Sequence, residues 1–310
     1  MKRNWIRQVV YPLLAAMIWG TAFVFQSVST EFVGPFTFTM LRSAIGVAFL
    51  GLLLLGRSLL VRCGVMKGQG KRDVKALLLG GFLCGTVLTV ATNLQQVGLH
   101  YGTTAGKSAF LTALYVVLVP LVGLLLFRRR ESPALWISIV LAVGGLYFLC
   151  ITEGEKMIAG DIFTLLCAVA FTAHIMVIDR FGARVDGVEL SCVQFVVVAL
   201  WSALGMLLTE QPTLEAIGAC IGPILYVGIF SSGVAYTLQI LAQKGSNPTV
   251  VSLLLCLESV FATVATVLML GQWMSTRETV GSVLMLIAVL LAQIPSDAWR
   301  RVFKRGVKQE

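Results

Sequence analysis

Two stretches of the chain, one in each half, match each other and decide the fold. Residues 103–150 read TTAGKSAFLTALYVVLVPLVGLLLFRRRESPALWISIVLAVGGLYFLC, and residues 247–294 read NPTVVSLLLCLESVFATVATVLMLGQWMSTRETVGSVLMLIAVLLAQI. At an offset of 144 residues, Ser108 falls on Ser252. Each stretch holds two apolar runs of about 20 residues, the length of a helix that crosses a bilayer. The matched stretches therefore predict two pairs of membrane-spanning helices.

The composition of the whole chain agrees with a membrane protein. Of its 310 residues 57% are hydrophobic and 13% charged, whereas charged residues make up about a quarter of a soluble domain. The apolar runs are continuous, which favours helices over the alternating strands of a membrane barrel. We therefore predict an all-α membrane protein with ten transmembrane helices, over residues 9–28, 34–55, 76–97, 103–127, 133–151, 159–178, 188–208, 217–241, 248–271 and 278–295.

The basic residues indicate how these helices are oriented. With the amino terminus inside, 20 of the 24 Lys and Arg residues fall in inner segments and only Lys156 and Arg277 in outer ones. Positive charge marks cytoplasmic loops. We expect both termini to be cytoplasmic. The formal net charge of +9 is then explained by the orientation in the membrane and does not indicate a nucleic-acid partner.

The first parts of the two halves also match. At an offset of 152 residues, AAMIWGTAFVF around Trp19 falls on CAVAFTAHIMV around Phe171. Each half then holds five spans. Because five is an odd number, the second half enters the membrane from the opposite side to the first, so we predict a 5+5 inverted repeat. Such repeats recur in transporters with a central site. The expected domains are two five-helix repeats and a basic cytoplasmic tail, over residues 9–151, 159–295 and 296–310.

The matched segments resemble a known family. WGTAFVFQSVS, PFTFTMLRSAIGVAFL and LYVVLVPLVGLLL in the first half, with GDIFTLLCAVAFTAHIMVI and SLLLCLESVFATVATVLMLG in the second, resemble the EamA repeats of the drug/metabolite transporter superfamily. The resemblance implies ten helices in an inner or plasma membrane, and export or exchange of small metabolites such as amino acids. It also implies a cavity lined mainly by helices 1, 3, 4, 6, 8 and 9.

Two positions depart from the family's pattern. Ser259 follows Glu258 where the family often has proline, and Gly271-Gln272 stands where it often has a Gly-Glu pair. The predicted architecture does not depend on either position, but no role is carried over for a second carboxylate.

Two of the ionisable residues inside spans are candidates for substrate binding. Lys107 lies about 6 Å inside the outer boundary of the membrane, and Glu258 lies about 15 Å inside the inner boundary. Both side chains project from matching faces of equivalent helices. Lys107 either reaches the outer headgroups or faces the cavity. Glu258 either bonds a neighbouring helix or serves as a cavity carboxylate for a cationic substrate group or for a proton, the candidate coupling ion.

Other residues are assigned to the helix scaffold or to the cavity wall. We assign Arg42 a structural role, in helix packing or carbonyl bonding, ahead of substrate contact, and we expect Pro120 to kink its helix. Asn93 and Gln239 are either cavity donors or interhelical hydrogen-bonding residues. His174 is either an interior histidine or a proton relay. The predicted substrate-binding residues are Glu258, Lys107, Trp19, Asn93, His174, Tyr236 and Gln239.

The sequence offers little support for other kinds of site. The seven cysteines form no CxxC pair, so we expect no disulfide framework, no metal site and no cofactor. The segment from Gly102 to Ser108 resembles a phosphate loop but has Tyr101 where its first glycine is required. We therefore expect a secondary transporter of a small organic metabolite and no enzyme; the alternatives are a membrane-embedded enzyme, a non-transporting scaffold, or an uptake carrier.

Overall fold

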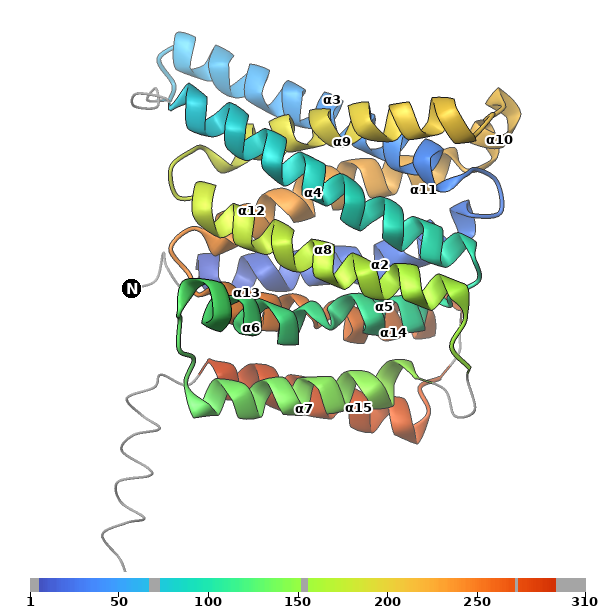
Figure 1. Cartoon of the computed structure of the whole chain (residues 1–310). Helices are drawn as coiled ribbons and strands as arrows, with labels where there is room; N and C mark the ends of the chain where they lie inside the picture. Colours follow the sequence, from blue (N-terminus) through green and yellow to red (C-terminus); the bar gives the residue numbers. More distant parts are fainter. Residues whose placement is uncertain (1–5, 67–72, 152–155, 271–272, 294–310) are drawn as a thin grey trace, which may run out of the picture.

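The computed structural model describes residues 6–66, 73–151, 156–270 and 273–293, and the secondary structure in these ranges is helical throughout. Figure 1 shows the helices lying side by side in stacked layers, with the chain reversing at either end. In chain order they are η1 (Ile6–Val10), α2 (Tyr11–Ser29), α3 (Pro35–Arg62), α4 (Val74–His100), α5 (Ala105–Ala113), α6 (Tyr115–Phe127), α7 (Pro133–Cys150), α8 (Ala159–Phe181), α9 (Gly187–Thr209), α10 (Leu214–Ala219), α11 (Ile221–Tyr226), η2 (Val227–Ala235), α12 (Tyr236–Gln243), α13 (Pro248–Leu255), α14 (Glu258–Leu270) and α15 (Thr276–Ala292).

Nine segments of the described chain are long and apolar enough to cross a membrane. Each overlaps one of the first nine predicted spans; the largest differences are at the ends of Pro35–Arg62, predicted as 34–55, and of Pro248–Ala265, predicted as 248–271. The tenth predicted span, 278–295, corresponds to α15, which has 17 residues; residues 294 and 295 lie outside the described residues, as does the predicted tail 296–310. Three spans are interrupted: α5 is followed by α6, α13 by α14, and α11 reaches α12 through the π-helix η2.

The two halves of the chain are packed into each other. α8 lies against α4 of the first half, while α2 lies against η2 and α14 of the second. α3 packs on α9, and α7 on α15. The last pair is very close, because a Cβ added at Gly145 would stand 2.8 Å from the Gly281 carbonyl oxygen, and one at Gly281 would stand 2.6 Å from that of Gly145. Small residues permit such contact between helices in lipid.

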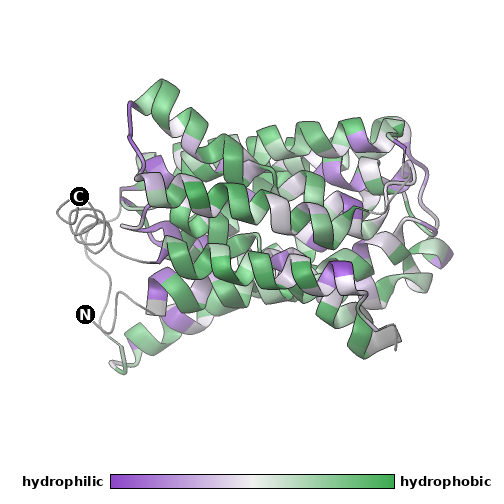
Figure 2. Cartoon of the chain, turned by 90° about the horizontal axis from the view of Figure 1, so that it is seen from below, coloured by the Kyte–Doolittle hydropathy of each residue, from purple (hydrophilic) through white to green (hydrophobic). Residues whose placement is uncertain are grey.

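The molecule is apolar outside and carries polar side chains inside. Leucines such as Leu125 and Leu207 are each 75% exposed, and hydrophobic residues cover the sides of the helices in Figure 2. Many glutamine, serine and threonine side chains are buried between helices. A bilayer solvates the outer leucines, so this surface is that of a membrane protein.

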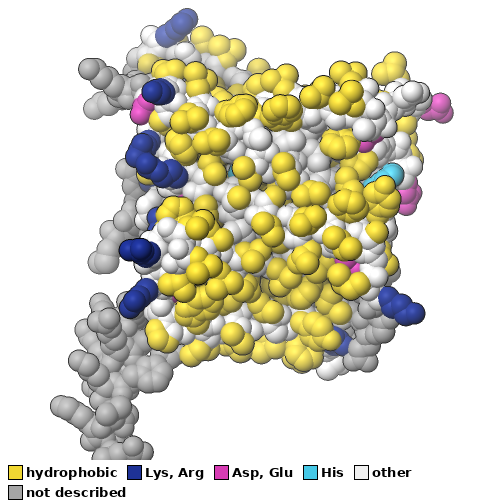
Figure 3. Space-filling view, viewed as in Figure 1, with side chains coloured by type: hydrophobic (Ala, Val, Ile, Leu, Met, Phe, Trp, Pro, Cys, Tyr) yellow, Lys and Arg dark blue, Asp and Glu magenta, His cyan; other side chains and the backbone are white. Residues whose placement is uncertain are grey.

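Basic side chains gather at one end of the described structure. Figure 3 shows most of the Lys and Arg side chains at the end where α3 and α6 finish and α4 begins. There Arg57 on α3 pairs with Asp186 at 3.1 Å and with Glu189 at 2.9 Å, both at the start of α9. Arg129, after α6, pairs with Asp179 of α8 at 2.7 Å. These ion pairs join the first half to the second.

At the opposite end, a carboxylate of the second half caps a helix of the first. The N-cap of α3 is Gly34, which has no side chain to cap the helix. The Glu210 carboxylate, just after α9, accepts hydrogen bonds from Phe36 N at 2.9 Å, Thr37 N at 2.8 Å and Thr37 Oγ1 at 2.6 Å. It thereby satisfies backbone N–H groups that a helix start leaves without partners.

Candidate functional site

Two spans break at closely matching positions of the two halves, near the middle of the molecule. α5 ends at Ala113 and α6 begins at Tyr115; α13 ends at Leu255 and α14 begins at Glu258. At the offset of 144 residues the second break, Cys256-Leu257, falls on Thr112-Ala113, directly before Leu114, so the two breaks lie within two residues of each other in the aligned halves. Both contain tighter i to i−3 hydrogen bonds, which often mark a hinge when they occur inside a helix.

The two breaks touch each other. In an unbroken helix the Ala113 carbonyl would accept the Val117 amide, but Val117 N bonds Leu114 O at 3.0 Å. The Ala113 carbonyl oxygen accepts the Cys256 thiol instead, at 3.5 Å. A hydrogen bond therefore joins one break to the other.

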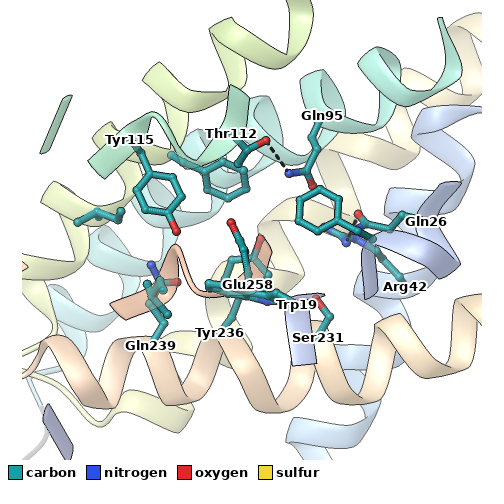
Figure 4. A pocket seen from close by; sticks show the side chains of 14 residues that line it. Trp19, Gln26, Arg42, Gln95, Thr112, Tyr115, Ser231, Tyr236, Gln239 and Glu258 are labelled. Atoms are coloured by element: carbon teal, nitrogen blue, oxygen red, sulfur yellow. Dashed lines mark hydrogen bonds between the residues drawn. The ribbon is translucent and has the colours of Figure 1, made fainter. Parts of the chain in front are cut away.

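A pocket with a cavity volume of about 30 Å³ lies beside the two breaks. Its walls come from α2, α3, α4, α5, α6, α8, η2, α12, α13 and α14, so helices of both halves contribute (Figure 4). The lining residues are Trp19, Phe23, Gln26, Arg42, Gln95, Thr112, Tyr115, Phe171, Ile175, Ser231, Tyr236, Gln239, Leu255 and Glu258.

Glu258 stands at the centre of this pocket. Its side chain is 4% exposed, and its Oε1 atom has no hydrogen-bond partner. It is the first residue of α14, where the helix dipole favours a negative charge. In Figure 4, Tyr115 and Gln239 lie to one side of it; the Gln239 Oε1 atom is also buried without a partner, and the Tyr115 side chain interacts with Glu258 and with Cys256. Buried polar atoms are normally bonded, so these atoms can accept a polar partner inside the pocket.

Aromatic rings form the wall next to the carboxylate. The Trp19 ring centroid lies 4.8 Å from that of Tyr236, and the Phe195 ring centroid lies 5.3 Å from that of Tyr236. The indole Nε1 of Trp19 is buried and has no partner. The π-helix η2 immediately precedes Tyr236 and carries Ser231 into the pocket. The wall thus combines apolar faces with a few polar atoms, as binding pockets for organic molecules do.

Lys107 is placed elsewhere, at the end of the molecule where α5 begins. Its ammonium lies 2.7 Å from an Asp161 oxygen and donates to the Lys156 carbonyl at 2.8 Å. Asp161 also accepts from Thr103 Oγ1 and from Ile158 N, each at 2.9 Å. Lys107 is not among the residues that line the pocket, so the structure does not bring it together with Glu258.

The remaining predicted residues divide between the pocket and the helix contacts. Trp19, Tyr236 and Gln239 line the pocket, as does Arg42, which we had assigned to the scaffold. Asn93 donates to Ser202 Oγ of α9 at 2.9 Å, and His174 Nε2 lies 3.1 Å from the Gln194 amide oxygen. Neither lines the pocket. Pro120 lies inside α6, and the break comes six residues before it.

Several lining residues were not selected from the sequence. Gln26 is a buried amide in an apolar span and could have been found by the rule that selected Asn93. Tyr115 could have been found from the alignment of the halves, because it directly follows the residue matched to Glu258. Phe23, Phe171 and Ile175 give no such signal, since apolar residues at helical spacing usually serve packing.

Comparisons with known proteins agree with this architecture. The sequence pattern of the EamA-like transporter family matches residues 7–151 and 158–293. An uncharacterized transporter of Archaeoglobus fulgidus is 28% identical over 281 residues, covering 91% of this chain and 84% of its own length. An uncharacterized transporter of Methanothermobacter thermautotrophicus is 26% identical over 243 residues, covering 74% of this chain and 68% of its own.

A solved crystal structure has the same fold. It aligns with a TM-score of 0.74 at 20% identity and covers 92% of this chain and 96% of its own. The family pattern covers both halves, and the described spans and central pocket are those of a multi-pass membrane protein. This chain belongs to the EamA-like transporter family.

Proposed function

We propose that the chain is a secondary transporter that exports or exchanges a small organic metabolite, such as an amino acid, by alternating access. The observation that carries the proposal is the buried pocket between two broken spans, lined by Trp19, Tyr115, Gln239 and Glu258, in which Trp19 Nε1, Gln239 Oε1 and Glu258 Oε1 have no hydrogen-bond partner. Broken helices at the middle of a membrane protein are a recurrent setting for transported solutes.

The proposed architecture is ten spans in a 5+5 inverted repeat, in a plasma or inner membrane, with both termini cytoplasmic. The breaks after Ala113 and Leu255, which lie within two residues of each other in the aligned halves, support the repeat. The gathering of basic side chains at one end supports the orientation, since positive loops stay on the cytoplasmic side (Figure 3). A break in each half allows the two pairs of half-helices to rock about the pocket.

In this proposal Glu258 binds a cationic group of the substrate, or a proton, during the cycle. Its position at the start of α14, deep in the molecule, leaves it no route to the headgroups. A carboxylate in such a place is costly unless it has a function or a partner.

The test is transport by the purified full chain in liposomes. Amino acids and cationic drugs are first screened for thermal stabilisation, and the best ligand is then assayed for flux with and without a pH gradient. Since a hydrogen bond to a charged group contributes about 1.5 to 3 kcal/mol, we expect Glu258→Gln to lower uptake at sub-saturating solute by about tenfold or more and to remove the pH dependence.

The matched control is Glu215→Gln, which makes the same change at an exposed position of α10. It is expected to transport as the unsubstituted protein does. Normal flux and unchanged pH dependence in Glu258→Gln would refute the role of the carboxylate. Absence of flux for every solute from an intact protein would instead favour a membrane enzyme or a scaffold.

A further inference from the structure

A second and larger cavity lies at the end of the molecule opposite the one where most basic side chains gather. Its volume is about 400 Å³, and its walls come from α2, α5, α7, α14 and the start of α15. We call it the distal cavity; Thr104 before α5, Cys150 at the end of α7 and Glu278 near the start of α15 are among its lining residues. Cavities that bind small organic molecules measure about 300 to 1,000 Å³, so the distal cavity has room for one.

The pocket beside Glu258 is too small for such a molecule in the described conformation. Its volume of about 30 Å³ is about the share of one water molecule in the liquid. A solute therefore reaches Glu258 only when the pocket opens into a neighbouring space. The helices α5 and α14 lie between α2 and the pair formed by α7 and α15 (Figure 1), and both the pocket and the distal cavity are bordered by α2, α5 and α14.

The wall between the two cavities is thin. On α5, Ala109 lines the distal cavity and Thr112 lines the pocket; on α14, Ser259 lines the distal cavity and Glu258 the pocket. Among the described residues, Phe23 of α2 alone lines both. Phe23 is 3% exposed, so its side chain is packed into the wall that separates them.

The backbones of α2 and α14 touch one helical turn away from Phe23. A Cβ added at Gly20 would stand 2.6 Å from the Glu258 carbonyl oxygen and 2.7 Å from the Ala262 amide nitrogen. This contact leaves no space between the two backbones, and only movement of a whole helix would open it. The Phe23 ring, in contrast, turns about its side-chain bonds between rotamers. The easier connection between the cavities therefore runs past Phe23.

We propose that the distal cavity is the passage between the Glu258 pocket and that side of the membrane, and that the Phe23 ring closes it. This inference rests on the transport function proposed above and adds the route of the solute and the residue that controls it. The solute occupies the distal cavity, where Thr104, Ser259 and Glu278 offer polar groups. It passes to Glu258 when the ring turns aside.

The experiment measures how fast a water-soluble reagent reaches a thiol on either side of Phe23. Native Cys150 reports on the distal cavity, and Ser231→Cys places a thiol of similar size in the pocket. The purified full chain in lipid nanodiscs is treated with a quaternary-ammonium methanethiosulfonate, and peptide mass spectrometry follows each thiol separately. We expect Cys150 to react at least about tenfold faster than the pocket thiol, which reacts only during local opening.

Substitution of Phe23 is expected to remove the barrier. In the Ser231→Cys background, Phe23→Ala should raise the rate of the pocket thiol by about tenfold or more, because neighbouring groups only partly refill the space of a deleted ring. The rate of Cys150 should not change. Phe23→Leu gives an intermediate increase, and it serves if Phe23→Ala does not fold.

Two further variants distinguish the passage from a general loosening of the protein. Phe171→Ala removes the same ring from a wall of the pocket that the distal cavity does not touch, and should leave the pocket thiol slow. Cys150→Trp fills part of the distal cavity. Added to Phe23→Ala, it should lower the rate of the pocket thiol several-fold.

The outcomes separate this inference from the transport function. A pocket thiol that reacts no faster in Phe23→Ala than in Phe171→Ala overturns the role of Phe23. A fast rate that Cys150→Trp does not lower overturns the distal route, because the reagent then arrives from the basic end. If the labelling follows the expected pattern but no solute crosses the liposome membrane, the passage stands and the transport function fails.

Discussion

Lys107 and Asp161 form an ion pair whose side chains are 5% and 0% exposed. Asp161 is further held by Thr103 and by the Ile158 amide. The sequence singled out Lys107 because a lysine in an apolar span is conspicuous. It did not reveal the partner, because Asp161 lies at the start of a helix two spans later, where an acidic residue is ordinary. Charges were thus found from the sequence, but their pairing was not.

Breaking this pair is expected to destabilise the protein. Lys107→Met leaves the Asp161 carboxylate without its cation, which costs about 3 kcal/mol for a buried pair. The double variant Lys107→Met/Asp161→Asn removes both charges and leaves one amide oxygen to accept a hydrogen bond from Ile158 N or Thr103, so it should recover part of the loss. The measurement is the free energy of unfolding in a detergent titration. Equal losses in the single and double variants would contradict the prediction.

The double variant also tests the prediction that Lys107 binds substrate. If its stability is restored but transport is lost, Lys107 contacts the solute in another conformation of the cycle. If transport is normal, Lys107 serves stability alone.

At the scale of elements, the positions of the spans followed from the sequence and their breaks did not. The chain runs through Leu114 and through Cys256-Leu257 without a glycine or proline, so the apolar pattern predicts continuous helices there. Pro120 lies six residues after the first break, and its equivalent in the second half is Val264. A proline is therefore not required for these breaks. Tertiary contacts such as the Cys256 thiol on the Ala113 carbonyl accompany them.

The same reasoning explains which part of the site was predictable. Glu258, Trp19, Tyr236 and Gln239 were found because polar or large aromatic residues stand out in an apolar span. Arg42 was found but assigned to the scaffold, because its depth in a helix does not show which face of the helix meets a pocket.

The hydrogen bond from the Cys256 thiol to the Ala113 carbonyl, between the two broken spans, leads to a prediction. Cys256→Ala leaves the Ala113 carbonyl without its donor, whereas Cys84→Ala removes an equally buried sulfur from α4. We expect Cys256→Ala to be about 0.5 to 1 kcal/mol less stable than Cys84→Ala, the contribution of one hydrogen bond. Cys256→Ser keeps a donor and should lie close to the unsubstituted protein. Equal stability of the two alanine variants would show that the bond contributes nothing.

At the scale of the whole molecule, the basic end and the opposite end can be distinguished in living cells. Cys63 is exposed beyond the end of α3, at the basic end, and the other cysteines are buried or half-buried. We expect a membrane-impermeant maleimide to label Cys63 only after the cells are permeabilised, because positive loops remain cytoplasmic. Labelling is measured by a mass shift on a gel.

The control places a thiol at the other end. Gln211→Cys, in a Cys63→Ser background, sits at an exposed position after α9, and should be labelled in intact cells. Labelling of Cys63 in intact cells, with protection of the introduced cysteine, would reverse the proposed orientation.

The Glu210 cap on α3 has a consequence for how the protein is made. The Phe36 amide and the carboxylate that caps it are 174 residues apart. At about 5 to 20 residues per second, a ribosome needs roughly 10 to 35 s to synthesise that interval. Until Glu210 is synthesised, the first turn of α3 lacks this cap, and its amide groups need other partners. The first half of the nascent chain therefore lacks this cap until α9 and Glu210 have been synthesised. A chain released before that point would expose the uncapped end of α3 to quality-control proteases.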